Sequence, residues 1–212
     1  MVRKNNMNKQ KNIHFLNDLS LWFLLFSNII TIFLAIKENW NLSTIMWIYW
    51  FQSVIIGFFN FIRMFQLKKF STEGVKIDGQ FVQPNNSTKF RLSFFFLFHY
   101  GFFHFGYLVF LLNYASLQIV GLKYILLTAL IFFINHLFSY IYNKPYDTKK
   151  QNIGTLMFYP YARIIPMHLV IIFGSIFGGA LTSFLILKTF ADAIMHIIEH
   201  KVLRREKIIS NL

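Results

Sequence analysis

Long apolar runs alternate with short polar stretches along the chain, and this pattern predicts helices that cross a membrane. A helix needs about 20 mainly apolar residues to span the hydrocarbon core of a bilayer. Four runs of suitable length can be read directly: 19–36, 43–65, 92–114 and 123–142. We expect each of them to form one transmembrane helix.

The last apolar stretch, 157–198, is too long for a single span. As one helix it would extend about 60 Å, roughly twice the thickness of the core. Gly178 and Gly179 near its middle offer a tight turn. We divide the stretch there into a fifth span, 157–177, and a sixth, 180–198. The predicted fold is therefore an all-α polytopic membrane helix bundle with six transmembrane helices.

Composition supports a membrane protein. Hydrophobic residues make up 56% of the chain and charged residues 14%, too few charges to cover the surface of a soluble domain. The net charge of +13 would suggest nucleic acid as a partner, but the basic residues lie between the apolar runs and at the two ends. We expect the lipid bilayer as the partner and no nucleic acid. Cysteine is absent, which excludes disulfides and thiolate metal sites.

The positions of Lys and Arg predict the orientation. These residues are frequent in the tail 1–18, in 63–91, in 143–151 and in the tail 201–212. With six spans all four segments fall on one side of the bilayer, which the positive-inside rule makes cytoplasmic. We expect both termini in the cytoplasm and a membrane domain over 19–200. Richness in Asn, Lys, Ile and Phe fits a prokaryotic cell membrane.

Two local signals concern the ends of the spans. The one sizeable loop, 68–89, contains Asp78-Gly79, a dipeptide typical of a two-residue hairpin turn. Three tryptophans near the outer end of the second span match the aromatic belt of a bilayer interface: Trp40, Trp47 and Trp50.

Ionisable residues inside a span are costly and mark candidate functional positions. In the sixth span, Lys188, Asp192 and His196 follow one another at intervals of four residues, so they share one helix face. Glu199 and His200 extend this face to the cytoplasmic edge. Mutual neutralisation of Lys188 and Asp192 is the purely structural alternative, but it leaves His196 unexplained.

The third span carries His99 and His104, five residues apart, so only one of them is expected to face the bundle at mid-depth. His104 is the deeper of the two. Gly101 and Gly106 flank it, and we expect them to allow a neighbouring helix to approach closely.

Polar side chains also occur in the fifth and second spans. Arg163 and His168 lie on either side of Pro166, where a kink is expected, and His168 needs a protein partner at its depth. Gln52 and Asn60 form a stripe on one face of the second span. For any of these residues taken singly, an interhelical hydrogen bond is the plainer interpretation.

Depth along the helices brings several of these groups together. Those near the midplane are Gln52, His104, His168, Lys188 and Asp192, with His196 slightly inward. Three imidazoles and a carboxylate could bind zinc or iron, with His104, His168, Asp192 and His196 as ligands. The same four groups could relay protons. The supporting polar residues are Gln52, Asn60, His99, Arg163, Lys188, Glu199 and His200. Because no metal-binding motif is present, the metal hypothesis rests on depth and composition.

Several segments resemble an uncharacterised prokaryotic multi-pass membrane family, a domain of unknown function. The matching segments are Tyr49–Asn60, Phe98–Gly101 with His104–Gly106, Pro160–Ile164 with His168, and Lys188 with Asp192, His196, Glu199 and His200. The resemblance covers nearly the whole chain after the N-terminal tail. Members commonly carry Glu where this chain has Gln52. The resemblance implies a membrane architecture and no particular reaction.

Three functions fit these observations. The first is a membrane-embedded metalloprotein, an enzyme acting on a lipid or quinone-like substrate. The second is a small proton-coupled transporter that uses Lys188 and Asp192 as a titrating pair. The third is a non-catalytic scaffold or assembly partner whose polar residues only hold helices together. A homo-oligomer is compatible with all three, and the sequence does not decide whether the protein is an enzyme.

Overall fold

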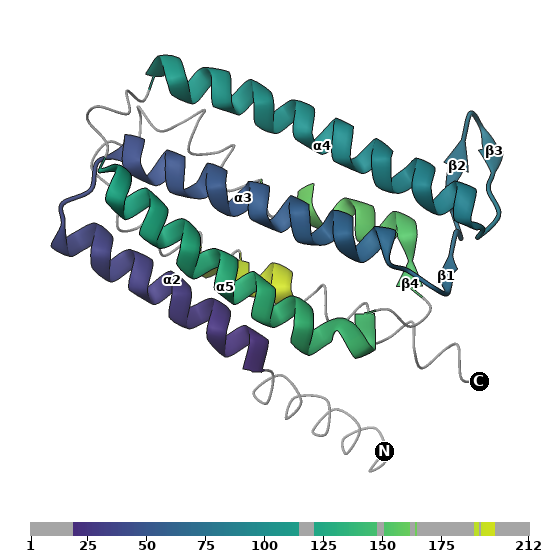
Figure 1. Cartoon of the computed structure of the whole chain (residues 1–212), viewed down its shortest axis with the longest axis horizontal. Helices are drawn as coiled ribbons and strands as arrows, with labels where there is room; N and C mark the ends of the chain where they lie inside the picture. The colour runs from purple at the N-terminus through teal and green to yellow at the C-terminus, as the bar shows by residue number, and fades with distance from the viewer. Residues whose placement is uncertain are drawn as a thin grey trace, which may run out of the picture.

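The computed structural model of the chain describes residues 19–114, 121–147, 151–161, 164, 189–190 and 192–197. Its long helices are α2 (Leu19–Lys37), α3 (Leu42–Phe65), α4 (Asn86–Tyr114) and α5 (Leu122–Asp147). All four are long and apolar enough to cross a membrane. Figure 1 shows them side by side and running in alternating directions. A membrane-type helical bundle, as predicted, is therefore present in the described part of the chain.

These helices cover the four predicted apolar runs and differ from them mainly at two polar ends. Helix α2 and helix α3 end within one residue of the predicted positions. Helix α4 begins at Asn86 instead of residue 92, because the side chain of Asn85 accepts a hydrogen bond from the Thr88 backbone amide and caps an additional polar turn. Helix α5 continues to Asp147 instead of residue 142.

The predicted fifth and sixth spans fall mostly outside the described residues. The structure describes helical backbone at 153–161 and at 192–197, which belong to these two stretches. The proposed turn at Gly178 and Gly179 and the two tails, 1–18 and 201–212, lie outside the described part. The count of six spans therefore stays a prediction.

The connection between α3 and α4 contains the predicted hairpin. Strands β2 (Lys76–Ile77) and β3 (Gln80–Phe81) pair antiparallel. Asp78 and Gly79 between them have φ angles of 52° and 78°, the left-handed conformation that a type I′ turn requires at both central positions. The Asp78-Gly79 prediction is confirmed.

A second strand pair, which the sequence did not predict, joins two connections at the same end of the bundle. Strand β1 (Phe70–Ser71) pairs in parallel with β4 (Gln151–Asn152), so the segment after α3 lies beside the segment after α5 (Figure 1). The start of α2 lies at this end too. The described parts of the basic segments, 63–91 and 143–147 with Gln151, thus lie at one end of the bundle.

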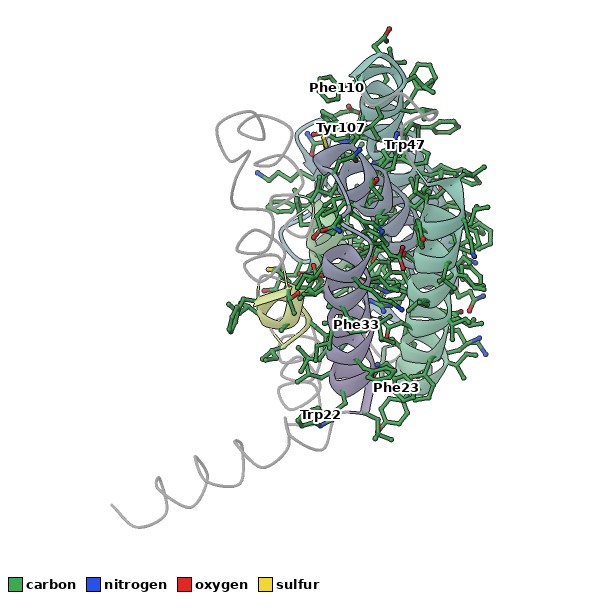
Figure 2. The ribbon with its side chains drawn as sticks, turned by 90° about the vertical axis from the view of Figure 1, so that its left-hand side faces the viewer. Trp22, Phe23, Phe33, Trp47, Tyr107 and Phe110 are labelled. Carbon is green, nitrogen blue, oxygen red and sulfur yellow. The ribbon has the colours of Figure 1, made fainter. Side chains whose placement is uncertain are left out.

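Helix α3 lies at the centre of the described bundle, packed against α4 and α5, while α2 packs against α5. Trp40 and Trp47, expected in an interfacial belt, are only 6% and 3% exposed and pack inside the protein. Carbon-rich side chains project from the outer sides of the helices in Figure 2, where Trp22 and Phe33 of α2 are labelled. These outer surfaces match the apolar surface that lipid covers.

Candidate functional site

Asp192 is a carboxyl group enclosed by the bundle. It lies in a stretch whose described residues, 189–190 and 192–197, are helical, and it is 4% exposed. The side-chain amide of Gln52, itself buried on α3, donates a hydrogen bond of 3.3 Å to the Asp192 Oδ2 atom. The sequence proposed both residues near mid-depth, and the structure brings them together.

Tyr49 joins this pair from one turn away on α3. Its side chain is 4% exposed, as buried as those of Gln52 and Asp192. The sequence analysis did not single out Tyr49 as a site residue. Its position three residues before Gln52, on the same helix face, was the available signal.

His196 makes the second polar contact of the same helical segment. Its Nε2 atom lies 2.9 Å from the hydroxyl oxygen of Ser20, at the start of α2. The Asn143 side-chain amide, near the end of α5, donates to that hydroxyl oxygen at 3.2 Å. All three side chains are buried. The sequence analysis missed Ser20, in the first turn of the predicted run 19–36, and Asn143, one residue beyond the run 123–142, since it singled out mainly ionisable side chains.

Asp192 and His196 therefore connect one helical segment to three membrane-type helices. Four residues separate them, which places both on one helix face about 6 Å apart along its axis. Through them the segment contacts α3 at Gln52, α2 at Ser20 and, by way of Ser20, α5 at Asn143. The result is a continuous buried set of polar groups between the helices.

His104 belongs to a different cluster, between α3 and α4. Its Nε2 atom lies 2.7 Å from the Ser53 hydroxyl, and its Nδ1 atom lies 2.8 Å from the Tyr100 backbone carbonyl. The Tyr100 hydroxyl donates to the Ser53 backbone carbonyl at 2.8 Å. Because a backbone carbonyl can only accept, Nδ1 carries the proton and Nε2 accepts from Ser53. Both ring nitrogens of His104 are thus engaged.

This arrangement bears on the metal hypothesis. Within the described residues, no group of three or more His, Asp or Glu side chains is placed to hold a metal ion. His104 faces Ser53, whereas Asp192 and His196 face Gln52 and Ser20. The described residues therefore do not support a shared zinc or iron site. The fourth proposed ligand, His168, lies outside them.

The other proposed residues have different surroundings. Asn60 is buried, and its amide donates to the Leu156 backbone carbonyl at 3.1 Å, which ties the helical segment 153–161 to α3. His99 is exposed, with its Nδ1 atom 2.7 Å from the Tyr161 hydroxyl. Of the two α4 histidines, His104 is buried, whereas His99 is exposed and contacts Tyr161 of the helical segment 153–161. Outside the described residues lie Arg163, His168, Lys188, Glu199 and His200.

Among the described residues, nothing lies within 4 Å of a Cβ atom added at Gly101 or Gly106, so no described helix makes the close approach expected there. Gly57 of α3 allows such an approach, because a Cβ atom there would overlap the Tyr100 ring. The periodicity of α4 did not reveal this, since the close contact depends on the partner helix.

Four apolar helices with buried polar contacts between them define the class of the protein as a membrane-type helix bundle. The model of a family of unknown function, DUF6498, matches residues 11–208, and the chain belongs to this family. No curated protein and no solved structure matches the chain. The resemblance to a domain of unknown function is confirmed, and family membership adds no reaction.

Proposed function

We propose that the protein is a small proton-coupled membrane transporter in which Asp192 and His196 bind and release the protons. The observation that carries this proposal is the burial of both ionisable groups, each with a hydrogen bond to a neutral side chain of a different membrane-type helix. Ionisable groups in such positions form the proton relays of pumps and transporters.

The hydrogen-bond partners suit a group that changes protonation state. The amide of Gln52 donates equally to a carboxylate and to the carbonyl oxygen of a carboxylic acid, so this contact suits both forms of Asp192. The Ser20 hydroxyl can donate to a neutral imidazole or accept from a protonated one. Neither partner therefore fixes the charge of the group that it contacts.

The proposal includes six transmembrane helices, with both termini in the cytoplasm of a prokaryotic cell. Ser20 and Asn143 lie at the end of the bundle that carries the basic segments, and Gln52 lies near the middle of α3. Protons would then pass from Asp192 near the midplane to His196 on the cytoplasmic side. Transport pathways commonly lie between two inverted repeats, and no such repeat is visible in a single chain. A pathway between two copies of the chain is therefore compatible with this function.

Proton flux into liposomes that contain the purified protein tests this function. A pH gradient is imposed across the liposome membrane, and a pH-sensitive dye reports the proton flux. The measurement is made under two conditions, with and without a mixture of polar solutes inside the liposomes, and we expect flux in at least one of them. Asp192→Asn should lower the flux at least about tenfold, because an amide cannot carry the proton. Asp78→Asn makes the same chemical change at an exposed turn position and should leave the flux unchanged.

Two results would contradict the proposal. One is flux equal to that of protein-free liposomes under both conditions, and the other is undiminished flux in Asp192→Asn. A scaffold whose polar residues only hold helices together predicts a different pattern. Asp192→Asn would then lower the thermal stability, and the native protein would show no flux.

A further inference from the structure

The buried face of α2 is lined with polar residues over most of its length. The buried polar residues of this helix are Ser20, Ser27, Asn28 and Thr31, each at most 3% exposed. Ser27 and Asn28 donate to the Leu24 backbone carbonyl, and Thr31 donates to that of Ser27. These bonds run within the helix, so they do not by themselves explain why polar side chains face inward.

Helix α5 presents three buried oxygen atoms on one face. The Thr128 Oγ1, Asn135 Oδ1 and Asn143 Oδ1 atoms have no hydrogen-bond partner in the part of the chain that the structure describes. Thr128 and Asn143 are 0% exposed and Asn135 is 5% exposed. Intervals of seven and eight residues are close to whole numbers of helical turns, so the three residues share a face.

The orientation of the Asn143 amide is determined by its contacts. Its Nδ2 atom donates to the Ser139 backbone carbonyl at 2.9 Å, and a carbonyl can only accept. The Oδ1 atom of Asn143 is therefore the one that lacks a donor. Exchanging the Oδ1 and Nδ2 atoms would not solve this, because the amide would then lose its hydrogen bond to the Ser139 carbonyl.

Three contacts define how α2 and α5 align. Ser20 bonds to Asn143, the Phe23 ring lies 4.3 Å from that of Phe138, and Glu38 accepts from the Tyr124 hydroxyl. The two helices are antiparallel, so the two residue numbers of each contact add up to nearly the same value. This constant sum gives the register between the helices. The same register puts Asn135 level with Ser27 and Asn28. It puts Thr128 level with Ala35.

We call this surface the α2–α5 seam, made of Ser20, Ser27, Asn28, Thr31, Thr128, Asn135 and Asn143. From Thr128 to Asn143 it extends about 22 Å along α5, most of the thickness of a hydrocarbon core. An unsatisfied polar group costs several kcal/mol where lipid excludes water. Buried water removes this cost by donating hydrogen bonds to such oxygens.

We propose that the α2–α5 seam holds a file of water molecules that carries protons along the bundle to His196. The file would supply the hydrogen bonds that the three α5 oxygens lack. It ends at Ser20, which contacts His196 directly. The role in proton transfer rests on the proposed transport function, whereas the presence of water in the seam can be measured independently.

Accessibility to silver ions tests the water file, because the chain contains no cysteine of its own. Single cysteines replace Thr128 or Asn135 in the seam, and Leu130 or Ile134, which are 55% and 54% exposed on the outer face of α5, as controls. Ag⁺ is close to water in size and reacts with the thiolate, which forms only where water is present. Blocked thiols are counted by maleimide labelling after denaturation.

We expect Ag⁺ to block the two seam cysteines at least about tenfold faster than the two outer ones, since thiolate is scarce in lipid. Equal rates at all four positions, or slower rates in the seam, would overturn the proposal. Proton flux supplies the second measurement. Asn135→Leu should lower it, and Asn135→Ser, which keeps a polar oxygen, should restore it.

The two measurements separate the file from the proposed function. Flux that depends on Asp192, combined with a seam that Ag⁺ does not reach, overturns the file and leaves the transporter standing. A seam that Ag⁺ reaches in a protein without proton flux refutes the proton-carrying role of the file together with the proposed function.

Discussion

The position of the His104 cluster depends on Gly57, whose lack of a side chain leaves room for the Tyr100 ring. The Tyr100 ring occupies the space where a Cβ atom of residue 57 would lie. There its hydroxyl bonds to the Ser53 backbone carbonyl, and its ring stacks on that of His104 with the centroids 4.2 Å apart. The packing of α3 against α4 at this level depends on glycine.

Substitution of Gly57 tests this dependence. Gly57→Ala should destabilise the protein by about 1–3 kcal/mol, because the Tyr100 ring is held by hydrogen bonds and cannot move aside freely. Gly101→Ala provides the matched control, since it adds the same methyl group to a helix where nothing lies within 4 Å. Thermal unfolding in detergent measures both. Equal midpoints for the two variants would refute the proposed contact.

For single residues, the sequence predicted the candidate polar residues better than it predicted the contacts between them. It gave His104 as the deeper of the two α4 histidines, and His104 is buried while His99 is exposed. It paired neither Gln52 with Asp192 nor Ser20 with His196, since both contacts join positions more than 100 residues apart in sequence. Hydrophobic periodicity within one helix carries no information about the register between helices.

The helices were predicted more accurately than the strands. A run of apolar residues long enough to span a bilayer identifies α2, α3, α4 and α5 without any knowledge of their partners. The polar turns at the start of α4 and the end of α5 have no such signal. Strands of two residues, such as β1 and β4, show no alternation from which a strand could be recognised.

Crosslinking tests the β1–β4 pair in this cysteine-free chain. Ser71 and Asn152 face each other in the register, so Ser71→Cys with Asn152→Cys should form an intramolecular disulfide under mild oxidation. Ser71→Cys with Gln80→Cys has no such pairing and should stay reduced. Gel mobility before and after reduction reports the crosslink. Oxidation of the control pair to the same extent would argue against the strand pairing.

For the whole molecule, alternating helix directions place the hairpin β2–β3 and the connection between α2 and α3 at opposite ends (Figure 1). The hairpin end carries the basic segments 63–91 and 143–151. The sequence predicted a common side for these segments from their charge, and which side of the membrane they face stays a prediction.

Labelling of intact cells tests which end faces outward. A cysteine at Lys37, an exposed position next to the α2–α3 connection, should react with a maleimide that cannot cross membranes. A cysteine at Gln80, exposed in the hairpin, should react only after the cells are opened. The reverse pattern would invert the proposed orientation and place the His196 end of the seam outside.

The parallel pairing of β1 with β4 also has a consequence for biosynthesis. When Phe70 leaves the ribosome its partner Gln151 has not been translated, and both α4 and α5 must be made before the strands can meet. Closing so long a loop is slow and entropically unfavourable. The pair can therefore form only late, after the helices between its strands have been inserted. A nascent chain that stalls within α5 would display an unpaired β1 edge, by which a quality-control protease could distinguish it from a completed molecule.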